Sequence, residues 1–166
     1  MSELTIIVLA RVIHIIAGVI WAGTTFVMTA VILPMIARHG PEGFGRWTGP
    51  IAQRVGPISG AAALLTVLSG IYLFVALHPH DASTGGMVLK VGAATALLSL
   101  LTGLFVSRPA GIKLAALSQS EGATQTDLGE RMAALRRRAT LSARFAAVLL
   151  GVSVLSMALF RYVGSL

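Results

Sequence analysis

Four long runs of apolar residues dominate the chain, and they cover approximately residues 4–37, 57–77, 87–106 and 141–163. A helix needs about 20 apolar residues to cross the hydrocarbon core of a bilayer, so each run is long enough for one transmembrane helix. Pro57 stands where a proline suits the first turn of a helix. The pattern therefore predicts an all-α fold, an integral membrane four-helix bundle in which residues 1–166 form a single domain.

The segment 107–140 is polar and basic, yet it carries a helix signal of its own. Asp127 is followed three residues later by Glu130, a spacing typical of the capping box at a helix start. We expect this loop to be partly helical and to continue into the fourth span. That span would then project well beyond the membrane.

Small residues recur at four-residue spacing in and before the second span. Gly56 and Gly60 form one such pair, and Thr66 and Gly70 form another. In lipid, this spacing lets neighbouring helices approach closely. We expect these positions at helix–helix contacts and assign them no chemistry.

Lysine and arginine are distributed unevenly among the segments that join the spans. Neither the N-terminal tail nor the loop at His78 contains any, whereas the other two loops are basic through Arg38, Arg46, Arg54, Arg108, Lys113, Arg131, Arg136, Arg137 and Arg138. The positive-inside rule predicts that both basic loops are cytoplasmic and that both termini and the His78 loop lie outside. We expect a multi-pass protein of a bacterial-type inner, or cytoplasmic, membrane.

The composition agrees with this reading and narrows the chemistry. Hydrophobic residues make up 55% of the chain and charged residues 11%, whereas soluble domains carry about 25% charged residues. The net charge of +7 is sorted into loops, so we expect no nucleic-acid partner. Because the chain has no cysteine, disulfides, thiolate metal sites and covalent haem attachment are excluded.

Four basic side chains fall in the outer half of the predicted spans: Arg11, His14, Lys90 and Arg161. The spans contain no aspartate or glutamate to neutralise them. A charge at membrane depth costs at least about 2.5 kcal/mol and normally faces a partner inside the bundle. The missing partner is therefore expected to be a ligand, either anionic, such as haem propionates or a lipid phosphate, or polar, such as a quinone head.

One helical stripe of the first span combines Arg11, His14, Gly18, Trp21, Thr25 and Met28. A histidine beside a glycine suits a flat macrocycle, because imidazole can ligate iron while the missing side chain leaves room for the ring edge. Met157 and Arg161 are one turn apart on the fourth span. In this interpretation Met157 is the opposite axial ligand of the haem iron and Arg161 contacts a propionate. Each of these residues also has a simpler structural interpretation. His14 could form a hydrogen bond to a neighbouring helix, and Lys90 and Arg161 could extend to the lipid headgroups. Trp21 and Met157 could pack in the core.

The outer loop offers an alternative metal site, formed by His78, His80, Asp81 and Met87. Two imidazoles with a carboxylate can hold Cu(II) or Zn(II) at a surface. Solvated loop histidines are the simpler interpretation.

The chain also resembles a known family through the series His14, Gly18, Trp21, Gly23 and Pro34, followed by Lys90 early in the third span. This pattern resembles the CopD-like copper-resistance membrane proteins and, distantly, the HemJ-type protoporphyrinogen oxidases, over spans one to three. The first resemblance implies copper handling. The second implies haem binding and activity at the positions of His14 and Lys90.

Three functions remain open from the sequence. The leading hypothesis is a membrane-embedded, haem b-binding redox or electron-transfer protein with His14 as axial ligand and its site in the outer half of the bilayer. If it is an enzyme, it would be a haem-dependent membrane oxidoreductase whose partner is a quinone or another redox protein. The alternatives are a copper-handling transport or binding protein and a structural or accessory membrane subunit. A homodimer is compatible with each.

Overall fold

The computed structural model describes residues 2–78, 82–117 and 125–163. These residues are helical apart from short connections and contain no strand. Four helices are long and apolar enough to cross a membrane: Glu3–Arg38, Gln53–Leu77, Thr84–Leu114 and Gly129–Val163. The all-α class and the multi-pass character predicted from the apolar runs are thus confirmed.

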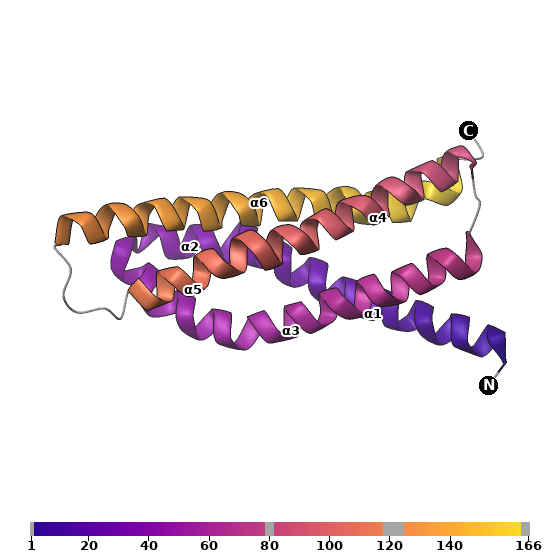
Figure 1. Cartoon of the computed structure of the whole chain (residues 1–166), viewed down its shortest axis with the longest axis horizontal. Helices are drawn as coiled ribbons and strands as arrows, with labels where there is room; N and C mark the ends of the chain where they lie inside the picture. Colours follow the sequence, from indigo (N-terminus) through magenta and orange to yellow (C-terminus); the bar gives the residue numbers. More distant parts are fainter. Residues whose placement is uncertain (1, 79–81, 118–124, 164–166) are drawn as a thin grey trace.

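The helices follow one another with few interruptions (Figure 1). In chain order they are α1 (Glu3–Val27), the π-helical η1 (Met28–Ile32), α2 (Leu33–Arg38), α3 (Gly40–Leu77), α4 (Thr84–Thr102), the π-helical η2 (Gly103–Ser107), α5 (Arg108–Leu117) and α6 (Gln125–Val163). Ser2 caps α1 by accepting from the Thr5 N–H, and Ser83 caps α4 by accepting from the Gly86 N–H. Serine is a preferred N-cap because its hydroxyl accepts from an otherwise unpaired backbone N–H.

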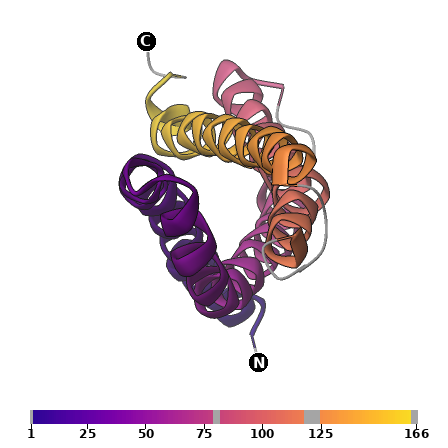
Figure 2. The ribbon, with the colours of Figure 1, turned by 90° about the vertical axis from the view of Figure 1, so that its left-hand side faces the viewer.

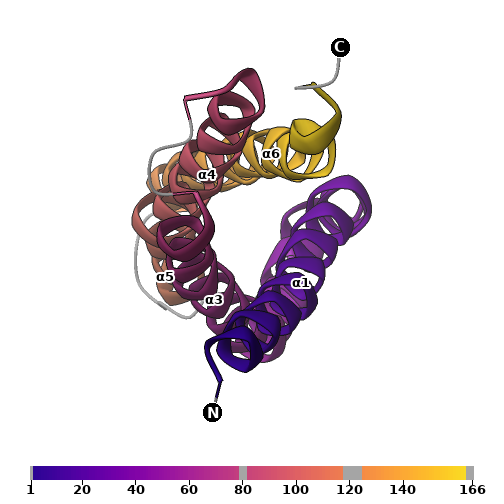
Figure 3. The same cartoon turned by 90° about the vertical axis from the view of Figure 1, so that its right-hand side faces the viewer.

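The chain forms two helical hairpins. In the first hairpin (α1 to α3), α1 packs along α3, and in the second hairpin (α4 to α6), α4 packs along α6. Contacts between the hairpins, from α1 to α6 and from α3 to α4, are much fewer. Figures 2 and 3, which view the molecule from its two ends, show these pairs lying side by side.

We name the two ends of the bundle by what they contain. The terminal end holds the start of α1, the end of α3, the start of α4 and the end of α6 (Figure 1). The basic end holds α2, the start of α3, α5 and the start of α6. The basic residues of both predicted loops are in the segments at this second end.

A central core of small side chains holds the helices together at mid-length. Its buried members are Ala17, Trp21, Ala22, Ala62, Ala63, Ala96 and Leu150. Alanines let helix backbones approach closely, as expected for helices packed in lipid. The buried hydroxyl of Ser99 on α4 also donates to the carbonyl of Ala146 on α6 at 2.9 Å, which ties the second hairpin together.

A second core lies at the basic end and joins both hairpins there. Ile36 of α2, only 1% exposed, and the buried Leu114 of α5 are surrounded by Ile32, Leu33, Ile51, Met132 and Leu135.

With 39 residues, α6 is about 58 Å long at 1.5 Å per residue, roughly twice the hydrocarbon thickness. Within the described residues, the segment 107–140 is helical in α5 and in the first part of α6, and α6 continues into the fourth apolar helix.

The boundaries of two helices differ from the predicted ones. We expected Pro57 at a helix start after a loop, but α3 begins at Gly40 and contains Pro50 and Pro57 in its interior. The packing of Ile51 against the second core favours helix where composition alone indicated a loop. The proposed capping box was also wrong, because α6 begins at Gln125, before Asp127.

Each π-helical turn ends two residues before a proline. The Leu33 N–H, next to Pro34, donates five residues back to the Met28 carbonyl, and the Arg108 N–H, next to Pro109, does the same to the carbonyl of Gly103. A proline ring clashes with the carbonyl four residues before it. The wider turn relieves that clash without breaking either helix.

Candidate functional site

His14 lies half-buried on α1 with its imidazole against α3. Its Nδ1 is 2.8 Å from the carbonyl oxygen of Thr66. A carbonyl can only accept, so this geometry assigns the proton to Nδ1. In the neutral imidazole, Nε2 then carries the lone pair that a metal ligand requires.

A glycine on the opposing helix makes this placement possible. A Cβ added to Gly70 would lie 2.8 Å from Cε1 and 3.1 Å from Nδ1 of His14, closer than side chains normally tolerate. Gly18, which the stripe suggested as the partner of His14, instead packs toward Thr66, whose Cγ2 would be 3.6 Å from an added Cβ. The glycine that accommodates the imidazole is therefore on α3.

Ser69 forms the other contact to the imidazole. Its Oγ is 3.4 Å from Nδ1 of His14 and donates to the carbonyl of Leu65 at 2.5 Å. Because its single proton is used within α3, the Ser69 hydroxyl does not donate to Nδ1, so this contact also leaves Nδ1 as the donor. The Thr66 hydroxyl likewise donates within α3, to Ala62 at 2.7 Å.

The rest of the predicted stripe separates into different environments. Trp21 is only 6% exposed and belongs to the central core, while Arg11, one turn before His14, is exposed. Thr25 and Met28 are half-buried, and the Thr25 hydroxyl donates to the Trp21 carbonyl at 2.8 Å. The packing interpretation of Trp21 thus accounts for its position.

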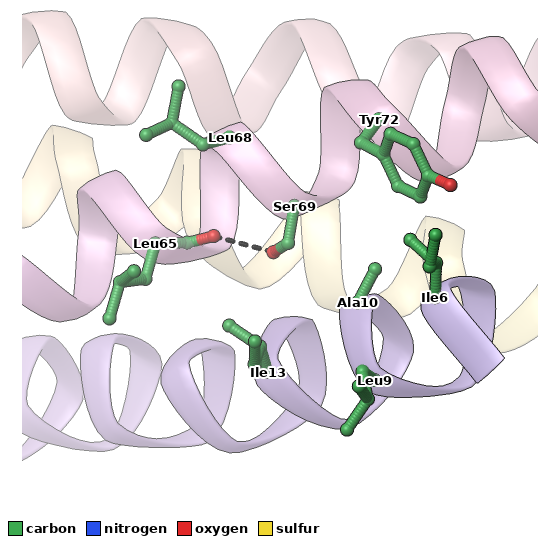
Figure 4. A pocket seen from close by; sticks show the side chains of 8 residues that line it. All are labelled: Ile6, Leu9, Ala10, Ile13, Leu65, Leu68, Ser69 and Tyr72. Atoms are coloured by element: carbon green, nitrogen blue, oxygen red, sulfur yellow. Dashed lines mark hydrogen bonds between the residues drawn. The ribbon is translucent and has the colours of Figure 1, made fainter. Parts of the chain in front are cut away.

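An apolar groove of about 330 Å³ runs between α1 and α3 toward the terminal end. Figure 4 shows its lining side chains, which are Ile6, Leu9, Ala10, Ile13, Leu65, Leu68, Ser69 and Tyr72. Ser69 contacts both this groove and the His14 imidazole. The histidine therefore stands beside a hydrophobic surface depression.

The remaining haem-site candidates belong to the second hairpin. Lys90 on α4 and Arg161 near the end of α6 are exposed. Met157 is half-buried, and its Cγ would lie 3.5 Å from a Cβ at Gly92. Met157 thus packs against α4, whereas His14 packs against α3.

The residues of the alternative copper site are only partly within the described structure. The His78 ring meets Phe160 edge to face, with ring centroids 5.9 Å apart, and Met87 is exposed on α4. His80 and Asp81 lie outside the described residues. Within the part of the chain that the structure describes, no three His, Cys, Asp or Glu side chains group as metal ligands.

No protein-family model, curated protein or solved structure matches this chain. The resemblance to CopD-like and HemJ-type proteins, including the roles it implies for His14 and Lys90, stays a prediction. The chemistry of the site is accordingly argued from the contacts of the residues themselves.

Proposed function

We propose that this protein is a membrane-embedded, haem b-binding electron-transfer protein in which His14 ligates the haem iron through Nε2. The observation that supports this most directly is the 2.8 Å contact between the His14 Nδ1 and the Thr66 carbonyl. Metal-ligating histidines almost always donate their other ring N–H to a carbonyl, carboxylate or water, which sets the tautomer and ring orientation. His14 has this arrangement before any ligand is considered.

The surroundings of His14 fit a flat apolar group. Gly70 leaves the imidazole room against α3, and the groove beside Ser69 is lined almost entirely by aliphatic and aromatic side chains. When bound, the haem iron would supply one-electron oxidation and reduction. The chain contributes the fixed imidazole and a water-poor environment.

Cations near the terminal end complete the proposal. Arg11 precedes His14 by one turn, and Lys90 and Arg161 are in the segments of α4 and α6 at the same end. In the proposed site they would neutralise haem propionates or meet a quinone head. By the positive-inside rule this end faces outward, so electron exchange with a quinone or another redox protein would occur near the outer face.

His39 provides a matched control for testing the ligand. The His39 Nδ1 also contacts a carbonyl oxygen, that of Met35 at 2.9 Å. Unlike His14, however, His39 is exposed, and its partner lies only four residues earlier in the chain. Full-length wild type, His14→Ala and His39→Ala would be purified from haem-replete cells and compared by visible absorption per protein. We expect wild-type haem content in His39→Ala and loss of the haem spectrum in His14→Ala; equal spectra in both would contradict the assignment.

A structural or accessory role is the second candidate, because the same hydrogen bond joins α1 to α3 directly. Interhelical bonds of this kind contribute about 0.6 kcal/mol on average in membrane proteins. In that case His14→Ala would lower the stability of a protein that carries no pigment. The spectrum of the wild type separates the two functions.

A further inference from the structure

One face of α6 at the basic end combines cationic and apolar side chains. Its exposed members are Arg131, Ala134, Arg137, Arg138, Leu141, Arg144 and Phe145. At 3.6 residues per turn they fall within an arc of about 140°. Ala147 and Leu150 are buried on the other side of the helix, so this surface, the α6 basic face, points away from the bundle.

The acidic residues of α6 offset only part of the charge of this face. Asp127 and the exposed Glu130 both precede Arg131, and no aspartate or glutamate follows Glu130 in the helix. Arg137 and Arg144 are two turns apart, and Arg131 and Arg138 repeat that spacing beside them. Two rows of guanidinium groups therefore run along the helix, with apolar side chains between them.

The same face continues as an aliphatic surface toward the terminal end. Val148 is 65% exposed, Leu155 61% and Leu159 50%, and all three keep the helical register of the basic face. In a helix that crosses a membrane, such side chains meet lipid acyl chains. Along one helix face, a cationic segment thus passes directly into an apolar one.

We propose that the α6 basic face binds an anionic phospholipid. The phosphate lies among Arg137, Arg138 and Arg144, and the acyl chains extend along Val148 and Leu155. Guanidinium groups bind phosphate oxygens in bidentate fashion, and clustered basic residues next to a membrane span attract anionic lipid. Nucleic acid fits this surface poorly because exposed leucine and phenylalanine side chains interrupt the cations and the neighbouring surface is aliphatic.

The test compares lipid binding to the full-length protein by native mass spectrometry. The protein is released from detergent with equal amounts of dioleoylphosphatidylglycerol and dioleoylphosphatidylcholine. The test variant carries Arg137→Gln, Arg138→Gln and Arg144→Gln. The matched control removes the same charge from other exposed positions at the basic end, through Arg38→Gln, Arg54→Gln and Lys113→Gln.

We expect the wild type to prefer phosphatidylglycerol at least tenfold. Each basic residue near an anionic surface strengthens attraction about fivefold. The affinity of the test variant for phosphatidylglycerol should therefore be between about tenfold and about 100-fold lower than that of the wild type. The control should stay within about threefold of wild type. The Arg→Lys form of the test variant, which keeps the charge, should retain the preference and shows that the helix still folds.

Three results would overturn the proposal. The first is equal binding of the two lipids by the wild type, and the second is an equal loss in the test variant and its control, which would indicate net charge alone. The third is displacement of phosphatidylglycerol by an equal concentration of soluble glycerol 3-phosphate. That outcome would indicate a free-phosphate site in place of a lipid site.

Discussion

Replacing Gly70 with alanine tests the placement of His14 at the atomic level. The new Cβ would lie 2.8 Å from Cε1 and 3.1 Å from Nδ1 of His14, so the imidazole must move away from α3. Such a movement lengthens the 2.8 Å hydrogen bond to the Thr66 carbonyl. Gly60 on the same helix is the matched control, because a Cβ there meets nothing within 4 Å.

The magnitude follows from two contributions. Losing the interhelical hydrogen bond costs about 0.6 kcal/mol on average and up to about 1.7 kcal/mol, and overpacking costs about 1–3 kcal/mol when the neighbour cannot retreat. Both glycines gain similar helix propensity on becoming alanine, about 1 kcal/mol, so that gain cancels in the comparison. Gly70→Ala should therefore lower the free energy of unfolding by about 1–3 kcal/mol relative to Gly60→Ala.

The assay is an unfolding titration with sodium dodecyl sulfate in mixed micelles, followed by tryptophan fluorescence, to which the buried Trp21 contributes. A double-mutant cycle with His14→Ala isolates the contact, because neighbouring residues show coupling that distant ones do not. In the His14→Ala background, the Gly70 and Gly60 substitutions should have the same effect. If Gly70→Ala is as mild as Gly60→Ala with His14 present, the imidazole is not held against α3 and the argument for its tautomer fails.

Two further substitutions test the packing of the bundle by the same titration. Ile36→Ala, at a side chain only 1% exposed, should cost about 2–5 kcal/mol, whereas Met35→Ala, 49% exposed, should stay within about 0.5 kcal/mol of wild type; equal effects would contradict the second core. Gly92→Ala places a Cβ 2.9 Å from the Ser156 Cβ and should destabilise the second hairpin by about 1–3 kcal/mol, whereas Gly103→Ala meets nothing within 4 Å and should not. A Gly92→Ala protein as stable as Gly103→Ala would contradict the close approach of α4 and α6.

The spans could be predicted because lipid requires long, continuous apolar runs, and four such runs are visible along the chain. The helix before Gln53 could not, since it depends on Ile51 packing against Ile36 and Leu114, which are distant in sequence. Composition around Gly40 indicates a loop when that packing is unknown. The hydropathy pattern identifies the membrane-spanning segments, but it does not predict the contacts of the second core.

The candidate site was likewise predictable only in part from the sequence. His14 was identifiable as an ionisable residue in an apolar run, and the spacing of Thr66 and Gly70 correctly indicated a helix contact. The same prediction was wrong for Gly56 and Gly60, where an added Cβ meets nothing within 4 Å. Their role toward His14 could not be predicted, because the sequence does not say which helix faces the histidine. Gly18 was the nearer choice along the chain, yet Gly70 is the glycine that the imidazole contacts.

Arg144 stands at the start of the apolar run 141–163, so the sequence places it inside the fourth span. In the structure it is exposed and aligned with Arg137 on the outer face of α6. The sequence position of Arg144 alone does not reveal the α6 basic face. Arg144 and Arg137 share this face because α6 continues as one helix beyond the predicted span.

The measurement that tests the central claim most directly is the visible absorption of the full-length protein, purified in mild detergent, in its oxidised and dithionite-reduced states. A pyridine haemochrome assay on the same sample gives the amount of haem b per chain. The proposed function predicts about one haem b per chain and a sharp reduced α-band that His14→Ala abolishes. A colourless protein from haem-replete cells would contradict it and favour the structural role of the bond between His14 and Thr66.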